Sequence, residues 1–328
     1  MKIHRRQIVK AVSVAGLALA SPLAWSQSYP DKPVRIIVPT AAGSGSDQLA
    51  RAIAQKLSDA WSSSVVVENR SGASGIVGVE AVARAPADGY TLLFTSASPI
   101  TINPLLYKKL PYDSKKDLTP VAQVGSASGA LLINAATPVN TLAELVALAK
   151  SKPNQLSYGS FGNGSGGHLA VAAFCKAADI QMIHVPYKGT APAVSDLLAG
   201  QITAVLTDLV TAQNHIKAGK LRALAINGSE RSSLLPDVKT FTEQGFASIE
   251  HTQATFGILA PTGTPAPIIE KVSRTLAAAL QAADIQERFG SIGYRLKGTT
   301  ANEFAIAIQQ DSERWSNVIK SIGGVSLD

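Results

Sequence analysis

Two short stretches rich in glycine and serine contain the residues whose types and spacing suit the binding of an anion. They are PTAAGSGSD at 39–47 and SFGNGSGGHL at 160–169, and each lies between an apolar run and an amphipathic helical pattern. Neither stretch contains Lys or Arg, but the backbone N–H groups at the start of a helix bind anions without them, and glycine lets a carboxylate approach closely. If the two stretches face each other across a cleft, they form a receptor for a small anion.

Glycine is also common in ordinary strand-to-helix turns, and either stretch alone fits that description. Their corresponding places in two α/β units favour a binding site. About four to six charge-assisted N–H bonds of ~1.5–3 kcal/mol each, less the cost of immobilising the ligand, suffice for the ~8 kcal/mol of a micromolar complex. We therefore expect valine at Gly43 or Gly166 to weaken binding more than folding.

The second stretch also matches a dinucleotide-binding pattern. Gly162, Gly164 and Gly167 are spaced GxGxxG between an apolar run and a helical pattern. This pattern requires an acidic residue at the end of the next strand to hold a ribose hydroxyl. The next run, IQMIHV, has no acid at its end, and Asp179 precedes it. A nucleotide-dependent oxidoreductase that uses Gly162–Gly167 is therefore the alternative from another class.

Other catalytic patterns are missing from the sequence. No serine lies in GxSxG, and the histidines of the mature chain are scattered without an HExxH pair. The single cysteine, Cys175, lies among apolar residues at helical spacing and cannot form an internal disulfide. We expect no catalytic residue, no metal site and no cofactor.

A few side chains beside these loops have more than one interpretation. His168 falls in a first helical turn, where it could donate to a ligand or be a partly buried structural residue. Tyr187 and Lys188 could close over a ligand, or Lys188 could be a solvated turn residue. Asp208 follows an apolar run and could orient a water, hold a polar group of the ligand, or cap the next element.

The elements that must position these residues alternate regularly. An apolar run at Val34–Pro39 is followed by the first glycine stretch and then by a helical pattern with Leu49, Ile53 and Leu57 on one face. The same alternation continues to residue 96, and a second set begins at Ala130. Such βαβα alternation predicts α/β units with parallel sheets covered by helices, and ligands bind at the carboxyl ends of such strands.

No linker separates the two sets, so we expect the chain to cross between lobes near 125–130 and to return near 250–256. The first lobe then comprises 27–127 plus 254–328, and the second comprises 128–253. Longer helical patterns lie at about Pro267–Gln281 and Glu303–Lys320.

The first 26 residues have the pattern of an export signal: four basic residues and no acidic one, an apolar run from Val12 to Ala20, and small residues before Ser26. Arg5 and Arg6 also fit a twin-arginine signal. Cleavage near Ser26 leaves 30 − 4 = 26 Lys and Arg against 23 Asp and Glu, a net charge of +3. Because this charge is small and unclustered, nucleic acid and anionic membranes are not expected partners.

Eight blocks in a fixed order resemble one protein family. They are YPDKPVRIIVP, ENRSGASGIVG, ADGYTLLFTS, NPLLYKKLPYD, YGSFGNGSGGHL, IHVPYKGTAPAVSDLLAGQI, IKAGKLRALA and FGILAPTGTPAPII. Together they make the chain similar to Bug-type solute receptors, the periplasmic substrate-binding components of tripartite tricarboxylate transporters. The resemblance implies a two-lobed periplasmic-binding-protein fold (type II-like), each lobe a mostly parallel sheet flanked by helices, with the ligand cleft between the lobes.

The resemblance also implies that the two glycine loops hold a carboxylate through main-chain N–H groups and bridging waters. Ser44 and Gly45 stand where the family usually has glycine and then proline, a departure that adds a hydroxyl and loosens the turn. The expected ligand-binding residues are Ala41, Ala42, Gly43, Ser44, Ser46, Asp47, Ser96, Ser98, Ser160, Gly162, Gly164, Ser165, Gly166, His168, Tyr187 and Asp208.

The expected function is that of a non-enzymatic, monomeric periplasmic receptor that delivers a small organic carboxylate to membrane permease subunits. The scarcity of basic residues near the cleft favours a mono- or dicarboxylate over citrate. An exported carboxylate sensor that reports to a signalling partner is a further alternative.

Overall fold

The computed structural model describes residues 29–250, 252–324 and 327. The expected export signal, its cleavage near Ser26 and His251 lie outside the described residues. None of the helices in this part of the chain combines the length and the apolar character that a membrane span requires.

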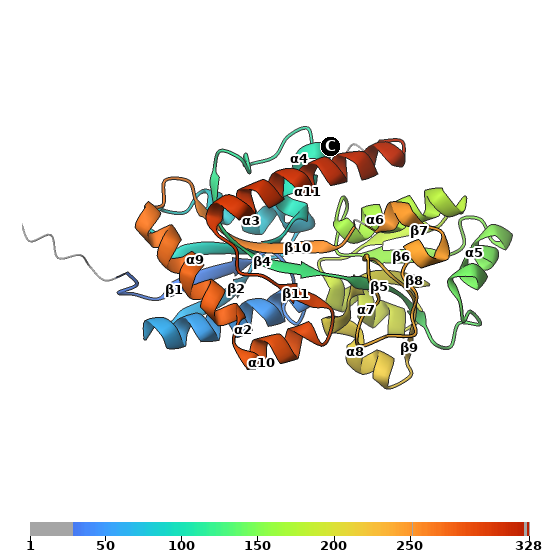
Figure 1. Cartoon of the computed structure of the whole chain (residues 1–328). Helices are drawn as coiled ribbons and strands as arrows, with labels where there is room; N and C mark the ends of the chain where they lie inside the picture. The colour runs from blue at the N-terminus through green and yellow to red at the C-terminus, as the bar shows by residue number, and fades with distance from the viewer. Residues whose placement is uncertain (1–28, 251, 325–326, 328) are drawn as a thin grey trace, which may run out of the picture.

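The strands form two separate sheets, which lie in the two halves of the molecule (Figure 1). In the first sheet the order is β11-β4-β10-β3-β1-β2, and in the second it is β7-β6-β8-β5-β9. The strands are β1 (Val34–Val38), β2 (Val65–Asn69), β3 (Thr91–Ser96), β4 (Leu118–Ala127), β5 (Gly129–Asn134), β6 (Ser157–Ser160), β7 (Ile183–Pro186), β8 (Ala204–Asp208), β9 (Leu221–Ile226), β10 (Ala254–Pro261) and β11 (Tyr294–Leu296).

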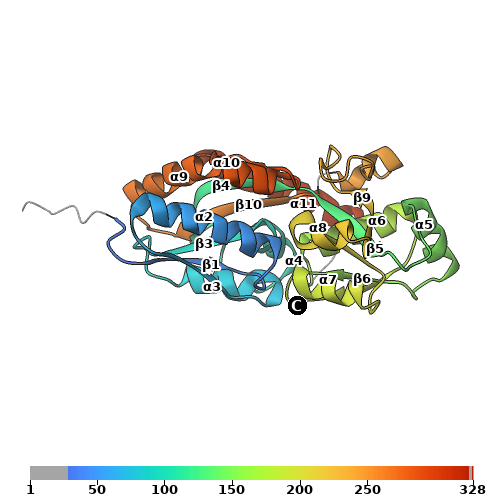
Figure 2. The same ribbon diagram turned by 90° about the horizontal axis from the view of Figure 1, so that it is seen from below.

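Most strands within each sheet run in one direction, which confirms the expected fold class. Strands β1, β2 and β3 pair in parallel, and β10 runs against both β3 and β4. In the second sheet β5 runs against its two neighbours β8 and β9, while β6 pairs in parallel with β7 and β8. Strand β11 runs against β4 at the edge of the first sheet. The antiparallel strands β5 and β10 immediately follow the two passages of the chain between the sheets, and Figure 2 shows β4 and β10 running toward the second half.

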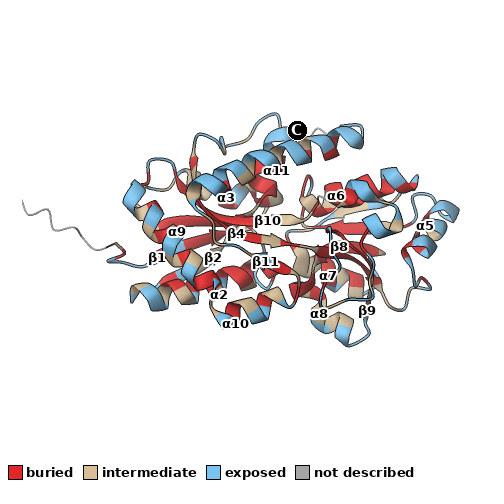
Figure 3. Ribbon diagram, viewed as in Figure 1, coloured by how far each residue is buried: buried red, intermediate tan, exposed pale blue. Residues whose placement is uncertain are grey.

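Helices cover both sheets, with buried inner faces and exposed outer faces (Figure 3). Polar caps fix where several of them begin: the Ser44, Thr141, Ser165, Asp208 and Thr300 side chains each accept from a backbone N–H three residues ahead. The α-helices are α2 (Gly45–Trp61), α3 (Ile76–Ala83), α4 (Asn103–Leu106), α5 (Leu142–Ser151), α6 (Gly166–Ala178), α7 (Thr190–Leu198), α8 (Leu209–Lys217), α9 (Ala266–Leu280), α10 (Ala283–Ile285) and α11 (Ala301–Ser321). Shorter turns are η1 (Ala73–Gly75), η2 (Ser98–Ile102), η3 (Thr242–Gln244), η4 (Ala247–Ile249) and η5 (Gln286–Gly290).

The last helix, α11, packs on both halves of the molecule. Near its start, Phe304 is fully buried among residues of the first sheet and its helices. Near its end, Trp315 and Ile319 belong to a buried cluster with Leu169 and Phe174 of α6. The helix therefore joins the cores of the two lobes.

Candidate functional site

The first glycine loop, residues 39–47, is held by its own side chains. The buried Ser44 hydroxyl caps α2, accepting from the Asp47 N–H at 3.4 Å. The Asp47 carboxylate, also buried, accepts from the Gly43 N–H at 2.9 Å and from Asn69 Nδ2 at 2.9 Å. Ala42 and Gly43 at the tip are exposed. The hydroxyl that distinguishes Ser44 from the family pattern is thus used inside the loop.

Asp47 is ionised in this setting. Burial acts to raise its pKa, but hydrogen bonds from Arg51, Gly43 and Asn69 outweigh burial, so the pKa lies below the ordinary value for aspartate. The Asp47 charge takes up one of the loop's N–H groups, and its role in this structure is to shape the loop.

The second glycine loop, residues 160–168, is held by two stacked histidines. The Gly164 N–H donates to His168 Nδ1 at 3.0 Å, and the Ser160 hydroxyl lies 2.6 Å from His184 Nε2. The His168 and His184 rings stack with centroids 3.8 Å apart. Burial lowers the pKa of His168 to about 4, and burial together with the neighbouring His168 lowers that of His184 to about 3, so both are neutral near pH 7.

The two lobes touch across the cleft through these loops. The Gly45 N–H, at the start of α2, donates to Thr211 Oγ1 of the second lobe at 3.1 Å. The Gly166 N–H, at the start of α6, donates to Ser98 Oγ of the first lobe at 3.1 Å. Each loop therefore lies against polar groups of the opposite lobe, and the arrangement is closed.

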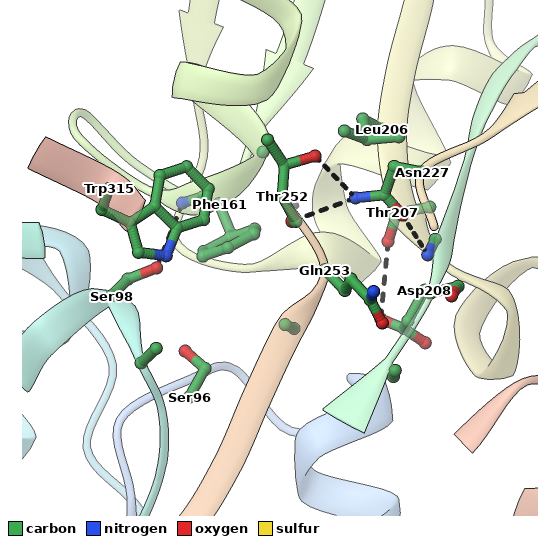
Figure 4. A pocket seen from close by; sticks show the side chains of 17 residues that line it. Ser96, Ser98, Phe161, Leu206, Thr207, Asp208, Asn227, Thr252, Gln253 and Trp315 are labelled. Atoms are coloured by element: carbon green, nitrogen blue, oxygen red, sulfur yellow. Dashed lines mark hydrogen bonds between the residues drawn. The ribbon is translucent and has the colours of Figure 1, made fainter. Parts of the chain in front are cut away.

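A cavity of about 60 Å³ lies between the lobes, beside the strands that pass between the sheets (Figure 4). This space corresponds to a few water molecules. None of the described residues that line it is basic. Its polar lining includes Ser96, Ser98, Gly167, Thr207, Asp208, Asn227, Thr252 and Gln253, and its larger apolar lining consists of Phe161, Leu206 and Trp315.

Asp208 lies at one side of this cavity and begins α8. Its Oδ1 accepts from the Thr211 N–H at 3.0 Å and from Thr211 Oγ1 at 3.1 Å. Burial raises the pKa of Asp208 above the ordinary value, and the hydrogen bonds only partly oppose this effect. Of the three roles considered for Asp208, the structure therefore shows the cap.

Asn227 also lines this cavity, and its side chain bonds to both segments by which the chain passes between the sheets. Its Oδ1 accepts from the Gly129 N–H at 2.5 Å, and its Nδ2 donates to the Thr252 carbonyl at 3.1 Å. The cavity is therefore bounded on one side by the segments that connect the lobes.

A second hollow of about 220 Å³ opens between the lobes at Pro39, residues 72–75, Tyr107 and Lys188. It includes Gly162 and Tyr187. The Tyr187 hydroxyl donates to Asp196 at 2.7 Å, which fixes its ring at the rim.

The structure thus distributes the expected ligand-binding residues over several places. Ser96, Ser98, Gly166 and Asp208 line the cavity, and Gly162 and Tyr187 line the second hollow. The two loops are held, through the bonds described above, by Ser44, Asp47, Ser160, Ser165 and His168. Neither space is lined by four residues of the first loop, Ala41, Ala42, Gly43 and Ser46, or by Gly164 of the second loop.

Sequence reasoning did not identify several residues of the site. Gly45 and Thr211 make the contact between lobes, and Asn227, Gln253 and Trp315 line the cavity from distant segments. A local pattern could have pointed to Thr211, because it stands three residues after Asp208, where the side chain of a helix cap accepts a backbone N–H. Nothing local marks Trp315, which has the spacing of any buried residue on an amphipathic helix. Among the described residues no cluster of three metal-ligating side chains occurs.

Comparison with known proteins agrees with this architecture. Residues 49–324 match the tripartite tricarboxylate transporter family receptor. BugT of Bordetella pertussis is 34% identical over 98% of this chain and 99% of its own. The R. palustris protein Rpa4515, solved with adipate, is 32% identical, with a TM-score of 0.88 over 91% of this chain and 100% of its own. MatC from Rhodopseudomonas palustris, solved with bound malate, is 29% identical, with a TM-score of 0.84 over 89% of this chain and 100% of its own. The chain therefore belongs to the tripartite tricarboxylate transporter receptor family, as a Bug-type member.

Proposed function

We propose that this protein is a periplasmic receptor that binds a small organic carboxylate between its lobes and delivers it to membrane permease subunits. The observation that carries the proposal is the inter-lobe cavity, where neutral donors surround the start of the 13-residue helix α6. Family membership and the adipate and malate bound by two solved relatives support a carboxylate as the ligand.

The start of α6 suits a carboxylate for a physical reason. Gly167 lies in the first helical turn, where an N–H has no acceptor within the helix, and it lines the cavity. The helix dipole adds a partial positive charge at the same point, worth ~0.3–2 kcal/mol to an anion. Ser98 accepts from Gly166, so its own O–H proton is available to a ligand.

We propose lobe boundaries at 127/128 and 253/254. The first sheet contains strands from both sides of the second, and β4 ends at Ala127 while β5 begins at Gly129. A ligand that contacts both lobes stabilises the closed arrangement, because it binds that arrangement better than the open one. We propose that the receptor works as a monomer.

We propose binding without catalysis. The oxidoreductase alternative needs a pyrophosphate against Gly162 and Gly164, but a Cβ at Gly162 would stand 2.5 Å from Ser74 Oγ, and one at Gly164 would stand 2.6 Å from Leu106 Cδ1. The opposite lobe therefore packs closely against both glycines in the closed form, which supports binding without catalysis. An exported sensor with the same ligand differs from a transport receptor in its partner, and uptake of labelled ligand by a deletion strain separates the two.

A thermal-shift screen of residues 27–328 tests the proposed function. The panel contains mono-, di- and tricarboxylates, aromatic acids and acidic amino acids, with the corresponding amides and NAD as controls. We expect stabilisation by at least one mono- or dicarboxylate and none by its amide. No shift with any anion, or a shift with NAD alone, contradicts the proposal.

A further inference from the structure

The indole N–H of Trp315 is a buried donor without a partner. Only 2% of the Trp315 surface is exposed, and its Nε1 has no hydrogen-bond partner. Two other side-chain atoms in the described part of the chain share this property, Asn103 Oδ1 and Tyr294 Oη, and neither is a donor only. Leaving a buried donor unsatisfied costs about 1–3 kcal/mol, so an acceptor at this position is strongly favoured.

Trp315 of α11 packs against the start of α6 and lines the inter-lobe cavity. A Cβ added to Gly166 would meet Trp315 Cζ2 at 3.3 Å and Cη2 at 3.4 Å, so the six-membered ring covers that residue. Figure 4 shows Trp315 and Phe161 on one side of the cavity, with the nitrogen-bearing edge of the indole toward Ser98, and Thr207 and Asn227 on the other side. Ser98, the first turn of α6 and Trp315 therefore lie together at one end of the cavity.

We propose that Trp315 Nε1–H donates to the carboxylate of the ligand, beside Ser98 and the first turn of α6. This inference rests on the proposed function and adds to it a binding residue from the last helix. The carboxylate belongs at this end because the other side of the cavity carries the Asp208 carboxyl group (Figure 4), which repels an anion when it is ionised.

The proposal also gives α11 a part in closure. Ser98 belongs to the first lobe, Gly167 to the second, and Trp315 to a helix that packs in the cores of both. A carboxylate that accepts from all three is bound fully only when they are brought together. The ligand thereby favours the closed arrangement through its differential affinity.

The tryptophan content of the chain makes the test specific. The sequence has three tryptophans, and Trp25 lies in the expected leader, so residues 27–328 contain only Trp61 and Trp315. Trp61 Nε1 donates to Thr275 Oγ1 at 3.1 Å, within the first lobe and outside the cavity lining. Trp61→Phe is therefore the matched control for Trp315→Phe, because both substitutions remove an indole N–H and the same ring atoms.

Calorimetric titration measures the affinity of wild type and both variants for adipate, malate and, as a minimal carboxylate, acetate. We expect Trp315→Phe to weaken carboxylate binding about tenfold or more, because hydrogen bonds to charged groups are worth ~1.5–3 kcal/mol. Its ligand-free melting temperature should fall only by the packing that is lost when phenylalanine replaces the larger indole, because the lost donor had no partner. Trp61→Phe should leave the affinity unchanged. A Trp315→Phe affinity within twofold of wild type overturns the inference.

The indole resonances give a second readout that needs no change in stability. Two ¹⁵N–¹H indole cross-peaks are expected from residues 27–328, and Trp61→Phe assigns them. Carboxylate should move the Trp315 proton resonance downfield and leave that of Trp61 in place. If wild type binds a carboxylate and the Trp315 resonance stays still, the inference alone fails. If wild type binds none of the three acids, the proposed function fails as well.

Discussion

Gly45 of the first lobe lies directly against the Asp208 carboxylate of the second. A Cβ on Gly45 would collide with Asp208 Oδ1 and would stand 2.9 Å from Tyr294 Oη. The backbone of Gly45 has no left-handed conformation, so this approach, and not the turn, is what requires glycine. The departure from the family pattern at this position thus lies at the contact between the lobes.

Gly45→Ala should oppose closure. The added methyl group meets Asp208 only when the lobes are together, so the open protein should fold normally. We expect carboxylate affinity to fall about tenfold or more, with a melting temperature near that of wild type, measured by calorimetric titration and thermal unfolding. Gly290→Ala is the control, because a Cβ there has only one neighbour, at 3.9 Å. Equal affinities for the two variants would show that the contact with Asp208 does not limit closure.

Valine at Gly166 should weaken binding through its contacts with Trp315 and Ser98. A Cβ there lies 3.3 Å from Trp315 Cζ2 and 3.6 Å from Ser98 Oγ, and the valine methyl groups extend further toward the cavity. We expect a loss of affinity of tenfold or more in the folded fraction, measured by titration after size-exclusion chromatography. Retention of wild-type affinity would show that the carboxylate does not approach the start of α6.

Gly43, unlike Gly166, has no neighbouring atom that an added Cβ would contact. A Cβ at Gly43 would meet nothing within 4 Å, but its φ of +82° is unfavourable for other residues. We therefore expect Gly43→Val to lower stability by ~1 kcal/mol through backbone strain. The expectation from the sequence, that the added side chain blocks the approach of the anion, stays a prediction at this position. Thermal unfolding and calorimetric titration of the variant check the two effects separately.

The stacked histidines should make the protein less stable in mild acid. His168 and His184 have folded-state pKa values of about 4 and about 3 because of burial, whereas an unfolded histidine titrates near 6.5. As pH falls from about 6.5 toward 4, only the unfolded state gains these protons, so the free energy of unfolding decreases, by up to ~1.4 kcal/mol per pH unit for each histidine.

Thermal unfolding between pH 7 and pH 5 measures this slope. His184→Gln should reduce it, and His215→Gln on α8, outside the stacked pair, is the control. A slope that does not change in His184→Gln would mean that His184 takes up its proton in the folded protein.

Asp208 should make carboxylate binding depend on pH. Its pKa is raised by burial, and its ionised form repels a carboxylate in the same cavity. Affinity should therefore rise as pH falls through the raised pKa of Asp208. Asp208→Asn keeps an oxygen to cap α8, and it should bind severalfold more tightly near pH 7 with a flatter pH profile. Weaker binding by Asp208→Asn would show that the carboxylate form holds a donor of the ligand.

Much of the fold follows from local pattern. Strand β1 and helix α2 were expected from an apolar run and a single apolar face, and they are found at Val34–Val38 and Gly45–Trp61. No strand was expected at β4, which contains Pro120 and Gly125, two residue types typical of turns. It forms because β10 and β11 pair with it on either side.

The site was less predictable than the fold, because it depends on contacts between segments that lie far apart in the sequence. The two glycine stretches are local features, and both were recognised. The cavity depends on which lobe surfaces meet, and that is decided by contacts such as Gly45 with Asp208 and Trp315 with Gly166. Residues separated by well over a hundred positions make these contacts, and no pattern of spacing within one helix or strand specifies them.

A crystal structure of residues 27–328, grown with the carboxylate that gives the largest thermal shift, would locate the ligand relative to α6 and Trp315. We expect one carboxylate group within hydrogen-bond distance of Ser98 Oγ, the Gly167 N–H and Trp315 Nε1, in a closed molecule. A carboxylate bound outside the inter-lobe cavity, or one that approaches Asp208 and leaves the start of α6 to water, would contradict this expectation.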